Sequence, residues 1–376
     1  TNVNTGTLLV NGTNSGIGLT TVANGAALGG NGTIAGPVTV NNGGTLFAGQ
    51  PTGATVGVLN VGDLTLNATS NLDFEFGAPN VSGLPDNDLI VVTGNLTLDG
   101  LLNVTDPGTG PGFGLGVYQL FTYTGAVTDN GLTVNSLPGS FTGVVQATLI
   151  PNQVNLLVAG PGVMIQYWQG ADTVGNGVDD GGNGTWDAGG SNWSSPPFGL
   201  NTNWQSGVAI FAGATGTVTV SGAQDFQGLE FATNNYVLNG GSLNMGGASF
   251  IAVAVADATI NSQLTGSGPL DKQLGGRLTL GGNNTYTGGT TLTAGTIQVM
   301  TNTALGTGQL TMQNGTTLQA GATVALANDV ALNGADTIDT QVNNLTLNGA
   351  ISGTGSLIKT GTGTLFLTNN TSSYSG

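Results

Sequence analysis

The sequence contains no cysteine and no histidine, and only three of its 376 residues are lysine or arginine. Without cysteine there is no disulfide and no thiol nucleophile, and without histidine there is no Ser-His-Asp triad and no histidine metal site. The 19 aspartates and glutamates give a formal net charge of −16. Binding to nucleic acid requires a basic patch, which this chain cannot form, so nucleic-acid partners are excluded.

Long hydrophobic runs are also missing. No apolar stretch approaches the roughly 20 residues that a membrane-spanning helix needs, so we expect no membrane insertion of this segment. The hydrophobic fraction is nevertheless 38%, and charged residues make up only 6%. This composition differs from that of disordered chains, which combine low hydrophobicity with high charge.

Glycine, threonine and asparagine are abundant, and 68 residues are glycine. Short segments alternate apolar and polar residues, which is typical of strands with one buried face; examples are 7–10, 59–61, 64–66, 96–98, 217–220 and 345–347. Asn-Gly pairs, which favour tight turns, separate many of them. The pattern predicts an all-β protein.

The same short unit recurs with little variation, which favours a β-solenoid over a sandwich because each coil then contacts only its neighbours. We expect about 20 residues per coil. Threonine suits the half-exposed strand surface, and asparagines of successive coils can stack and form amide–amide hydrogen bonds.

Composition changes divide the chain into four regions. We predict solenoid coils over 1–110, a wider coil or a small sandwich-like β element over 111–165, a Trp-, Asp- and Gly-rich insertion over 166–206, and solenoid coils again over 207–376. The third region holds all four tryptophans of the chain.

Residues 268–299 read GPLDKQLGGRLTLGGNNTYTGGTTLTAGTIQV. This segment resembles the passenger-associated β-strand repeat of bacterial autotransporters, with Leu274 standing where the pattern usually has glycine. The resemblance implies an exported, right-handed parallel β-helix located outside the cell or on its surface, and it supplies no catalytic residues.

A second copy spans 355–376 and stops within the motif, whose closing Gly-Thr-Leu is found at residues 6–8. From Lys272 to Gly295 is 23 positions, and from Lys359 through Gly376 to Gly6 of a following copy is also 23, whereas counting from the tyrosines leaves a mismatch of one. Solenoid ends expose unpaired strands and apolar core. We therefore expect copies to stack head to tail, in one chain or as subunits, although any coil end can fit any coil start.

Two groups of side chains are candidate binding sites. Carboxylate and amide oxygens on a Gly-rich loop suit Ca²⁺, and the candidate ligands are Asp179, Asp180, Asn183 and Asp187; a solvated turn is the alternative. Flat aromatic rings suit the apolar faces of sugars, and the candidates are Trp168, Trp186, Trp193 and Trp204; a local hydrophobic core is the alternative.

Carboxylate pairs and lysines complete the candidates. Asp73 and Glu75 are two apart on a predicted strand and therefore share a face, and Asp86 and Asp88 form a second pair. Glycoside hydrolysis uses two such carboxylates; exposed turn or face residues are the alternative. Lys272 and Lys359 occupy equivalent repeat positions and are expected to cover the coil surface with their stems.

The resulting prediction is a non-enzymatic structural unit of an extracellular bacterial fibre or giant surface protein, without a cofactor other than calcium. A carbohydrate-binding adhesin module that uses the Trp-rich segment and contacts surface polysaccharide is one alternative, and a polysaccharide-degrading β-helix enzyme is another. With histidine absent, stability is expected to depend little on pH near neutrality.

Overall fold

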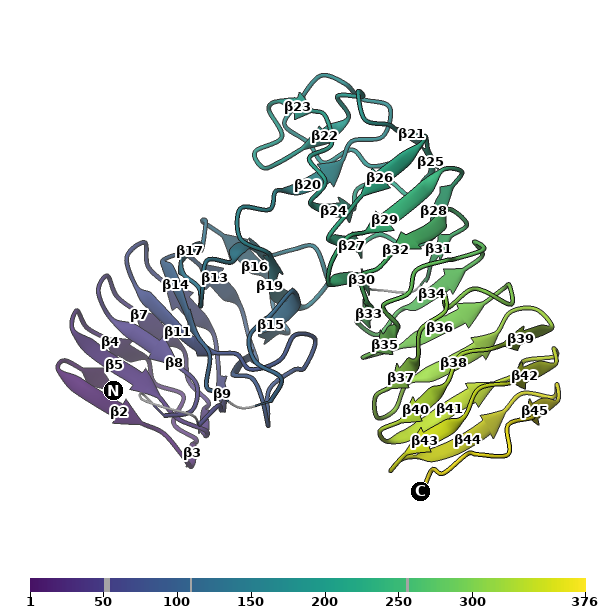
Figure 1. Cartoon of the computed structure of the whole chain (residues 1–376). Helices are drawn as coiled ribbons and strands as arrows, with labels where there is room; N and C mark the ends of the chain where they lie inside the picture. Colours follow the sequence, from purple (N-terminus) through teal and green to yellow (C-terminus); the bar gives the residue numbers. More distant parts are fainter. Residues whose placement is uncertain (51–54, 109, 255–256) are drawn as a thin grey trace. The chain divides into compact units, whose positions relative to one another are not determined.

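The structure, a computed structural model, describes residues 1–50, 55–108, 110–254 and 257–376. These residues form strands joined by turns and contain no helix, which confirms the all-β prediction; a helix able to cross a bilayer is likewise not found among them. They divide into two compact units, residues 1–162 and 163–376, coloured purple to teal and teal to yellow in Figure 1.

The first unit is a stack of coils in which each turn of the chain contributes one strand to each of three sheets (Figure 1). Leu64, for example, pairs in parallel with Val38 of the coil before and Leu96 of the coil after. Sheet 1 contains, in spatial order, β1 (Asn2–Val3), β4 (Thr20–Val22), β7 (Val38–Val40), β10 (Leu64–Leu66), β13 (Leu96–Leu98) and β16 (Val127–Asp129). Sheet 2 contains β17 (Thr133–Ser136), β14 (Leu101–Thr105), β11 (Asn71–Glu75), β8 (Thr45–Phe47), β5 (Ala26–Gly29) and β2 (Gly6–Leu9). Sheet 3 contains β18 (Thr142–Gln146), β19 (Gln153–Ala159), β15 (Gly116–Tyr123), β12 (Leu89–Val92), β9 (Val58–Val61), β6 (Thr33–Ile34) and β3 (Thr13–Asn14).

The second unit has two long sheets and two short ones. Sheet 4 contains β23 (Asn201–Thr202), β22 (Trp193–Ser194), β20 (Ile165–Trp168), β24 (Val208–Phe211), β27 (Gly228–Phe231), β30 (Ser249–Val253), β33 (Leu270–Gln273), β35 (Thr290–Leu292), β37 (Leu310–Met312), β40 (Val330–Leu332) and β43 (Ile351–Gly353). Sheet 5 contains β21 (Gly184–Trp186), β25 (Thr217–Val220), β28 (Tyr236–Asn239), β31 (Asp257–Ile260), β34 (Arg277–Leu280), β36 (Thr296–Val299), β38 (Thr317–Ala320), β41 (Ala335–Asp339) and β44 (Ser356–Thr360). Sheet 6 contains β26 (Ala223–Asp225), β29 (Ser242–Met245) and β32 (Gln263–Gly266), and sheet 7 contains β39 (Val324–Leu326), β42 (Leu345–Leu347) and β45 (Leu365–Leu367).

The strands bury alternate residues, as the period-2 pattern predicts. In β10, Leu64 and Leu66 point into the core while Thr65 lies on the outer surface. Asparagines on that outer surface bond between coils: the Asn261 side chain donates to Asn239 at 2.8 Å. Parallel pairing of stacked coils is the arrangement of a β-solenoid, and the predicted amide ladders are present.

The stack of coils does not continue from one unit to the other. In sheet 3, β15 pairs in parallel with β12 but antiparallel with β19, and β18 then adds to β19. These antiparallel strands occupy the region predicted as a wider coil or small β element. The described residues contain no sheet with strands from both units.

The Trp-rich segment is the outermost coil of the second unit rather than an insertion between coils. β20 and β21 pair in parallel with β24 and β25, and β22 covers the free edge of β20 in antiparallel fashion. The boundary at 162/163 lies beside the predicted start of this segment. Its tryptophan rings join the apolar core of the second unit, which explains the local enrichment in large side chains.

Candidate functional site

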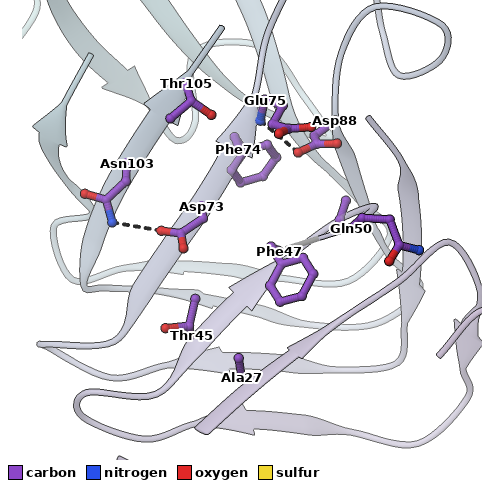
Figure 2. Close-up of a pocket in the computed structure, with 11 residues that line it drawn as sticks. Ala27, Thr45, Phe47, Gln50, Asp73, Phe74, Glu75, Asp88, Asn103 and Thr105 are labelled. Atoms are coloured by element: carbon purple, nitrogen blue, oxygen red, sulfur yellow. Dashed lines mark hydrogen bonds between the residues drawn. The ribbon is translucent and has the colours of Figure 1, made fainter. Parts of the chain in front are cut away.

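A pocket of about 450 Å³ lies on the outer face of sheet 2 in the first unit. β8, β11 and β14 form its base, since every second side chain of these strands points away from the core. The residues that line it, most of them labelled in Figure 2, are Ala27, Thr45, Phe47, Ala48, Gln50, Asp73, Phe74, Glu75, Asp88, Asn103 and Thr105. The lining therefore combines hydrogen-bonding groups with two buried phenylalanine rings, and no positively charged side chain is among these residues.

Asp73 and Glu75 share one face of β11, as the sequence predicts, and both line the pocket. The register places Asp73 between Phe47 of β8 and Asn103 of β14. The Asn103 amide donates to Asp73 Oδ1 at 2.9 Å (Figure 2), and Asn135 donates to Asn103 Oδ1 at 2.7 Å. The Asp73 carboxylate is thus part of a row of hydrogen-bonded polar side chains from three successive coils.

Asp88 is a buried carboxyl beside the same pocket. Its two oxygens accept hydrogen bonds from the backbone N–H groups of Gly57, at 2.6 Å, and Glu75, at 2.8 Å. Burial raises the pKa of Asp88 to about 8, and the charge of Glu75 acts in the same direction, while the two N–H groups lower the pKa. Both oxygens accept hydrogen bonds from the backbone. Asp88 therefore has the contacts of a structural residue, which holds Gly57 and Glu75 together beside the pocket.

The predicted pair of Asp86 and Asp88 is not a pair of equivalent acids. Asn87, which lies between them, is fully buried, and its side-chain oxygen accepts from the N–H groups of Gly77 and Ala78 at 2.9 and 3.1 Å. Its amide nitrogen donates to the Ala78 carbonyl at 2.6 Å. This short segment therefore fixes the loop between β11 and β12, a role that its Asp-Asn-Asp sequence did not reveal, and Asp88 is its only residue that lines the pocket.

The four tryptophans are brought together, but as a core and not as a binding surface. Trp168, Trp186 and Trp193 have no exposed surface, and Trp204 is 6% exposed. Ring centroids lie 4.5 Å apart for Trp193 and Trp204, and 5.0 Å apart for Trp186 and Trp193. Rings packed in this way cannot stack on a sugar, so the prediction of a Trp-based ligand surface is wrong.

The structure does not assemble the predicted calcium site. Asp180 accepts from Asn176, Asn183 accepts from the backbone N–H of Thr217, and Asp187 accepts from the N–H groups that follow it in its own turn. Burial and the neighbouring charge of Asp180 raise the pKa of Asp179 to about 6. Within the described ranges, no three acidic side chains group closely enough to hold a metal ion.

Lys272 lies inside the solenoid, so the prediction that its stem covers the coil surface is wrong. The side chain is completely buried, and Nζ donates to the carbonyls of Gln273, Leu274 and Ala294 at 2.9, 2.7 and 3.1 Å. Burial lowers the pKa of Lys272 to about 7, and the charge of Asp271 acts in the opposite direction. Burial also raises the pKa of Asp271.

The first and last coils that the structure describes lie at the edges of their sheets. β1, β2 and β3 end the three sheets of the first unit on one side, and β16, β17 and β18 end them on the other. In the second unit, β43, β44 and β45 end sheets 4, 5 and 7 on one side. The apolar side chains exposed on the first and last coils are Leu9, Ile17 and Leu19 in the first unit and Ile358, Phe366 and Leu367 in the second. Leu8 and Val10 pack on one core, and Leu357 and Leu365 on the other.

Comparison with known proteins gives two findings. The family model described as passenger-associated-transport-repeat matches residues 271–299 and 357–376. These two segments belong to the passenger-associated repeat family. The chain is also 41% identical, over 403 residues, to the adhesin BmaC autotransporter of Brucella suis biovar 1 (strain 1330). No solved structure gives a significant match.

The match with the adhesin covers 100% of this chain and 12% of the adhesin, so the chain corresponds to a small part of its relative's length. The resemblance to autotransporter passenger repeats is confirmed, and with it the extracellular, cell-surface location that the resemblance implies. Both findings relate this chain to the passenger repeats of autotransporters.

Proposed function

We propose that the chain is a structural segment of a cell-surface passenger, wound as a right-handed solenoid, and that copies stack head to tail into a fibre. The observation that carries this proposal is the parallel pairing of successive coils, as in β10, which pairs with β7 of the coil before and with β13 of the coil after. Coils paired in this way can be extended by a further coil of the same kind. Contacts that join unlike ends do not close on themselves and therefore extend into a filament.

The spacing of strands supports a specific register for this contact. In the complete repeat, the strands that follow Lys272 in the next coil, β35 and β36, begin at Thr290 and Thr296. Counting the same distances from Lys359 through Gly376 into a second copy leads to Thr1 and Thr7, next to the observed starts of β1 and β2. With β1 added to β44 and β2 added to β45, β1 would begin one position later than the repeat and β2 one position earlier.

The test is the sedimentation of the 376-residue chain over a wide concentration range. We expect self-association that rises with concentration and that Phe366→Asp weakens strongly, because a carboxylate would have to be buried against the added coil. Leu200→Asp is the matched control, since Leu200 is 80% exposed and lies in the segment that precedes β23. A chain that remains monomeric at every concentration would contradict head-to-tail stacking.

We also propose surface polysaccharide as a partner, bound at the pocket on sheet 2 and not by the tryptophans. The hydrogen-bonding groups of Thr45, Asn103 and Thr105 support this proposal, because sugars carry many hydroxyl groups. Binding of a panel of neutral bacterial oligosaccharides, measured by calorimetry, should be lost in Asp73→Ala. If the Asp73→Ala variant bound the oligosaccharides as tightly as the wild-type chain does, the pocket would not be their binding site.

A further inference from the structure

Among the described residues that line the pocket on sheet 2, the ionisable side chains are all carboxyl groups, those of Asp73, Glu75 and Asp88. Every lysine and arginine of the chain belongs to the second unit, so the first unit has none. The buried rings of Phe47 and Phe74 form part of the same lining. A concave surface with charge of one sign and low-dielectric walls concentrates the electrostatic field. The pocket is therefore suited to a positively charged ligand.

Asp73 is the exposed carboxylate of this group and lies in the middle of β11. Its Oδ1 accepts a hydrogen bond from the Asn103 amide at 2.9 Å (Figure 2), which fixes the orientation of the carboxylate. Its Oδ2 accepts no hydrogen bond from any residue that the structure describes. One oxygen is thus held by the protein, while the other is available to a ligand.

The strand register places neutral hydrogen-bonding groups around Asp73. Thr45 pairs with Asn71, and Thr105 pairs with Glu75, so both threonines share the outer face of the sheet with Asp73. Both line the pocket. A hydroxyl group can accept a hydrogen bond from an ammonium group and can also donate to or accept from the hydroxyl of a sugar. The pocket therefore combines one oriented charge with uncharged groups on either side of it.

The next step rests on the proposed binding of polysaccharide and names the class of sugar. We propose that the pocket on sheet 2 binds an amino sugar, a glycan unit with a protonated primary amine, and that Asp73 accepts a hydrogen bond from its ammonium group. The ring hydroxyls of the same unit would contact Thr45 and Thr105. An N-acetylated sugar lacks this charge, and an acidic sugar would be repelled by the carboxylates. The pocket would thus prefer deacetylated amino sugars to both.

A lysine-rich peptide offers the same ammonium group, but the lining favours the sugar. A lysine side chain carries its charge at the end of an apolar four-carbon stem. The groups beside Asp73 are instead the hydroxyls of Thr45 and Thr105 and the amide of Asn103. They suit a ligand that has several polar groups around its charge.

Calorimetry with three β-1,4-linked sugar trimers tests this preference. The trimers are those of glucosamine, N-acetylglucosamine and glucose, which carry an amine, an acetamide and a hydroxyl at the same carbon. At low salt, we expect the glucosamine trimer to bind about tenfold more tightly, or more, than the other two, the effect of a hydrogen bond between charged groups. Only its binding should weaken as salt is added, because salt screens the interaction between charges.

A variant pair tests the assigned residue. Asp73→Asn keeps the shape of the side chain and an oxygen that accepts from Asn103, so it should abolish the preference for glucosamine and leave the affinity for the glucose trimer within about twofold. Asp129→Asn is the matched control, because it makes the same change in charge on an exposed residue of the first unit that does not line the pocket. It should leave the preference within about twofold.

The outcomes separate this inference from the proposal on which it rests. If a neutral trimer binds as tightly as the glucosamine trimer, or if both variants reduce the preference equally, the amino-sugar assignment is wrong, while polysaccharide binding stands. If a trilysine peptide binds as tightly as the glucosamine trimer, the pocket recognises charge alone and the assignment is also wrong. If neither the glucosamine trimer nor any neutral oligosaccharide binds, both fail.

Discussion

Both units are stacks of coils, but the number of residues per coil varies more in the first unit than along most of the second. In the first unit the coil lengthens along the chain: Thr20 of sheet 1 pairs with Val38, whereas Leu64 of the same sheet pairs with Leu96, so the later coil is much longer. In the second unit the repeat stays close to 20 residues from β24 onward, since Val208 pairs with Gly228, and Thr290 pairs with Leu310. The coil length expected from the sequence therefore describes this part of the second unit and the first coils of the first unit, where Gly6 pairs with Ala26.

This difference shows where a solenoid acquires a local site. The long coils of the first unit include the loop between β11 and β12, and Asp88 at the end of this loop lines the 450 Å³ pocket. The regular coils of the second unit carry a smaller hollow of about 170 Å³, lined by glycine, threonine and one glutamine. Extra residues between strands form a pocket, whereas uniform coils form a continuous rod surface.

The largest expected effect tests whether each unit is stabilised by its own core. Trp193→Ala removes a fully buried ring that contacts three other tryptophans, and should lower the free energy of unfolding of the second unit by about 3–5 kcal/mol. Phe74→Ala should have a similar effect on the first unit only. Pulse proteolysis in urea, with fragments identified by mass, measures both. A loss of stability in both units from either variant would show that their cores are coupled.

A smaller effect tests the close spacing of the regular coils. A Cβ at Gly268 would lie 1.8 Å from the Gly247 carbonyl oxygen of the preceding coil, so Gly268→Ala should destabilise the second unit by about 1–3 kcal/mol. Gly247→Ala is the matched control, because a Cβ there has open space. Tryptophan fluorescence in urea follows this unit alone, since all four tryptophans belong to it. Equal stability of the two variants would contradict the steric argument.

The pH dependence should differ between the units, which revises the expectation of little dependence near neutrality. The pKa of Asp88 is raised to about 8, so the folded first unit holds a proton that the unfolded chain releases, and its stability should fall as pH rises from about 4 to 8. The pKa of Lys272 is lowered to about 7, so the unfolded second unit binds the extra proton, and its stability should rise as pH rises from about 7 to 10.

Urea unfolding between pH 8 and about 9.5 separates these effects, because the stability of the first unit should then be nearly constant while that of the second increases. Lys272→Met should abolish the increase, and Asp88→Asn should abolish the decrease in the first unit at lower pH. Parallel pH profiles for the two units in the wild-type chain would show that these two groups do not control them.

The smallest effect concerns the ion pair on the outer face of sheet 5. Arg277 Nε lies 2.9 Å from Asp257 Oδ1, and both side chains are about a third exposed or more. Arg277→Met should therefore cost less than about 1 kcal/mol, with the loss decreasing further at high salt. A much larger loss in the urea unfolding of the second unit would show that the regular coils depend on charge pairing as well as on their core.

Much of the fold could be predicted because its signals are local. Leu64, Thr65 and Leu66 show the alternation of a half-buried strand within one short segment, and the repeat motif at 271–299 is continuous in sequence. The candidate sites were less predictable. Asp73 and Glu75 share a face because they are two apart, but the Asn87 contacts that fix the loop after β11 depend on a conformation that no periodicity encodes.

The sequence by itself determined that this chain is all-β, that its strands are short and face a core with alternate residues, and that it carries two autotransporter-type repeats, because each of these follows from neighbouring residues. Only the tertiary structure decided that the coils form two units, that the tryptophans point inward and that Lys272 is buried while Lys359 is exposed. The physical reason is that burial depends on which coil lies next in space, and Ala294 covers Lys272 from a coil that begins many residues later in the chain.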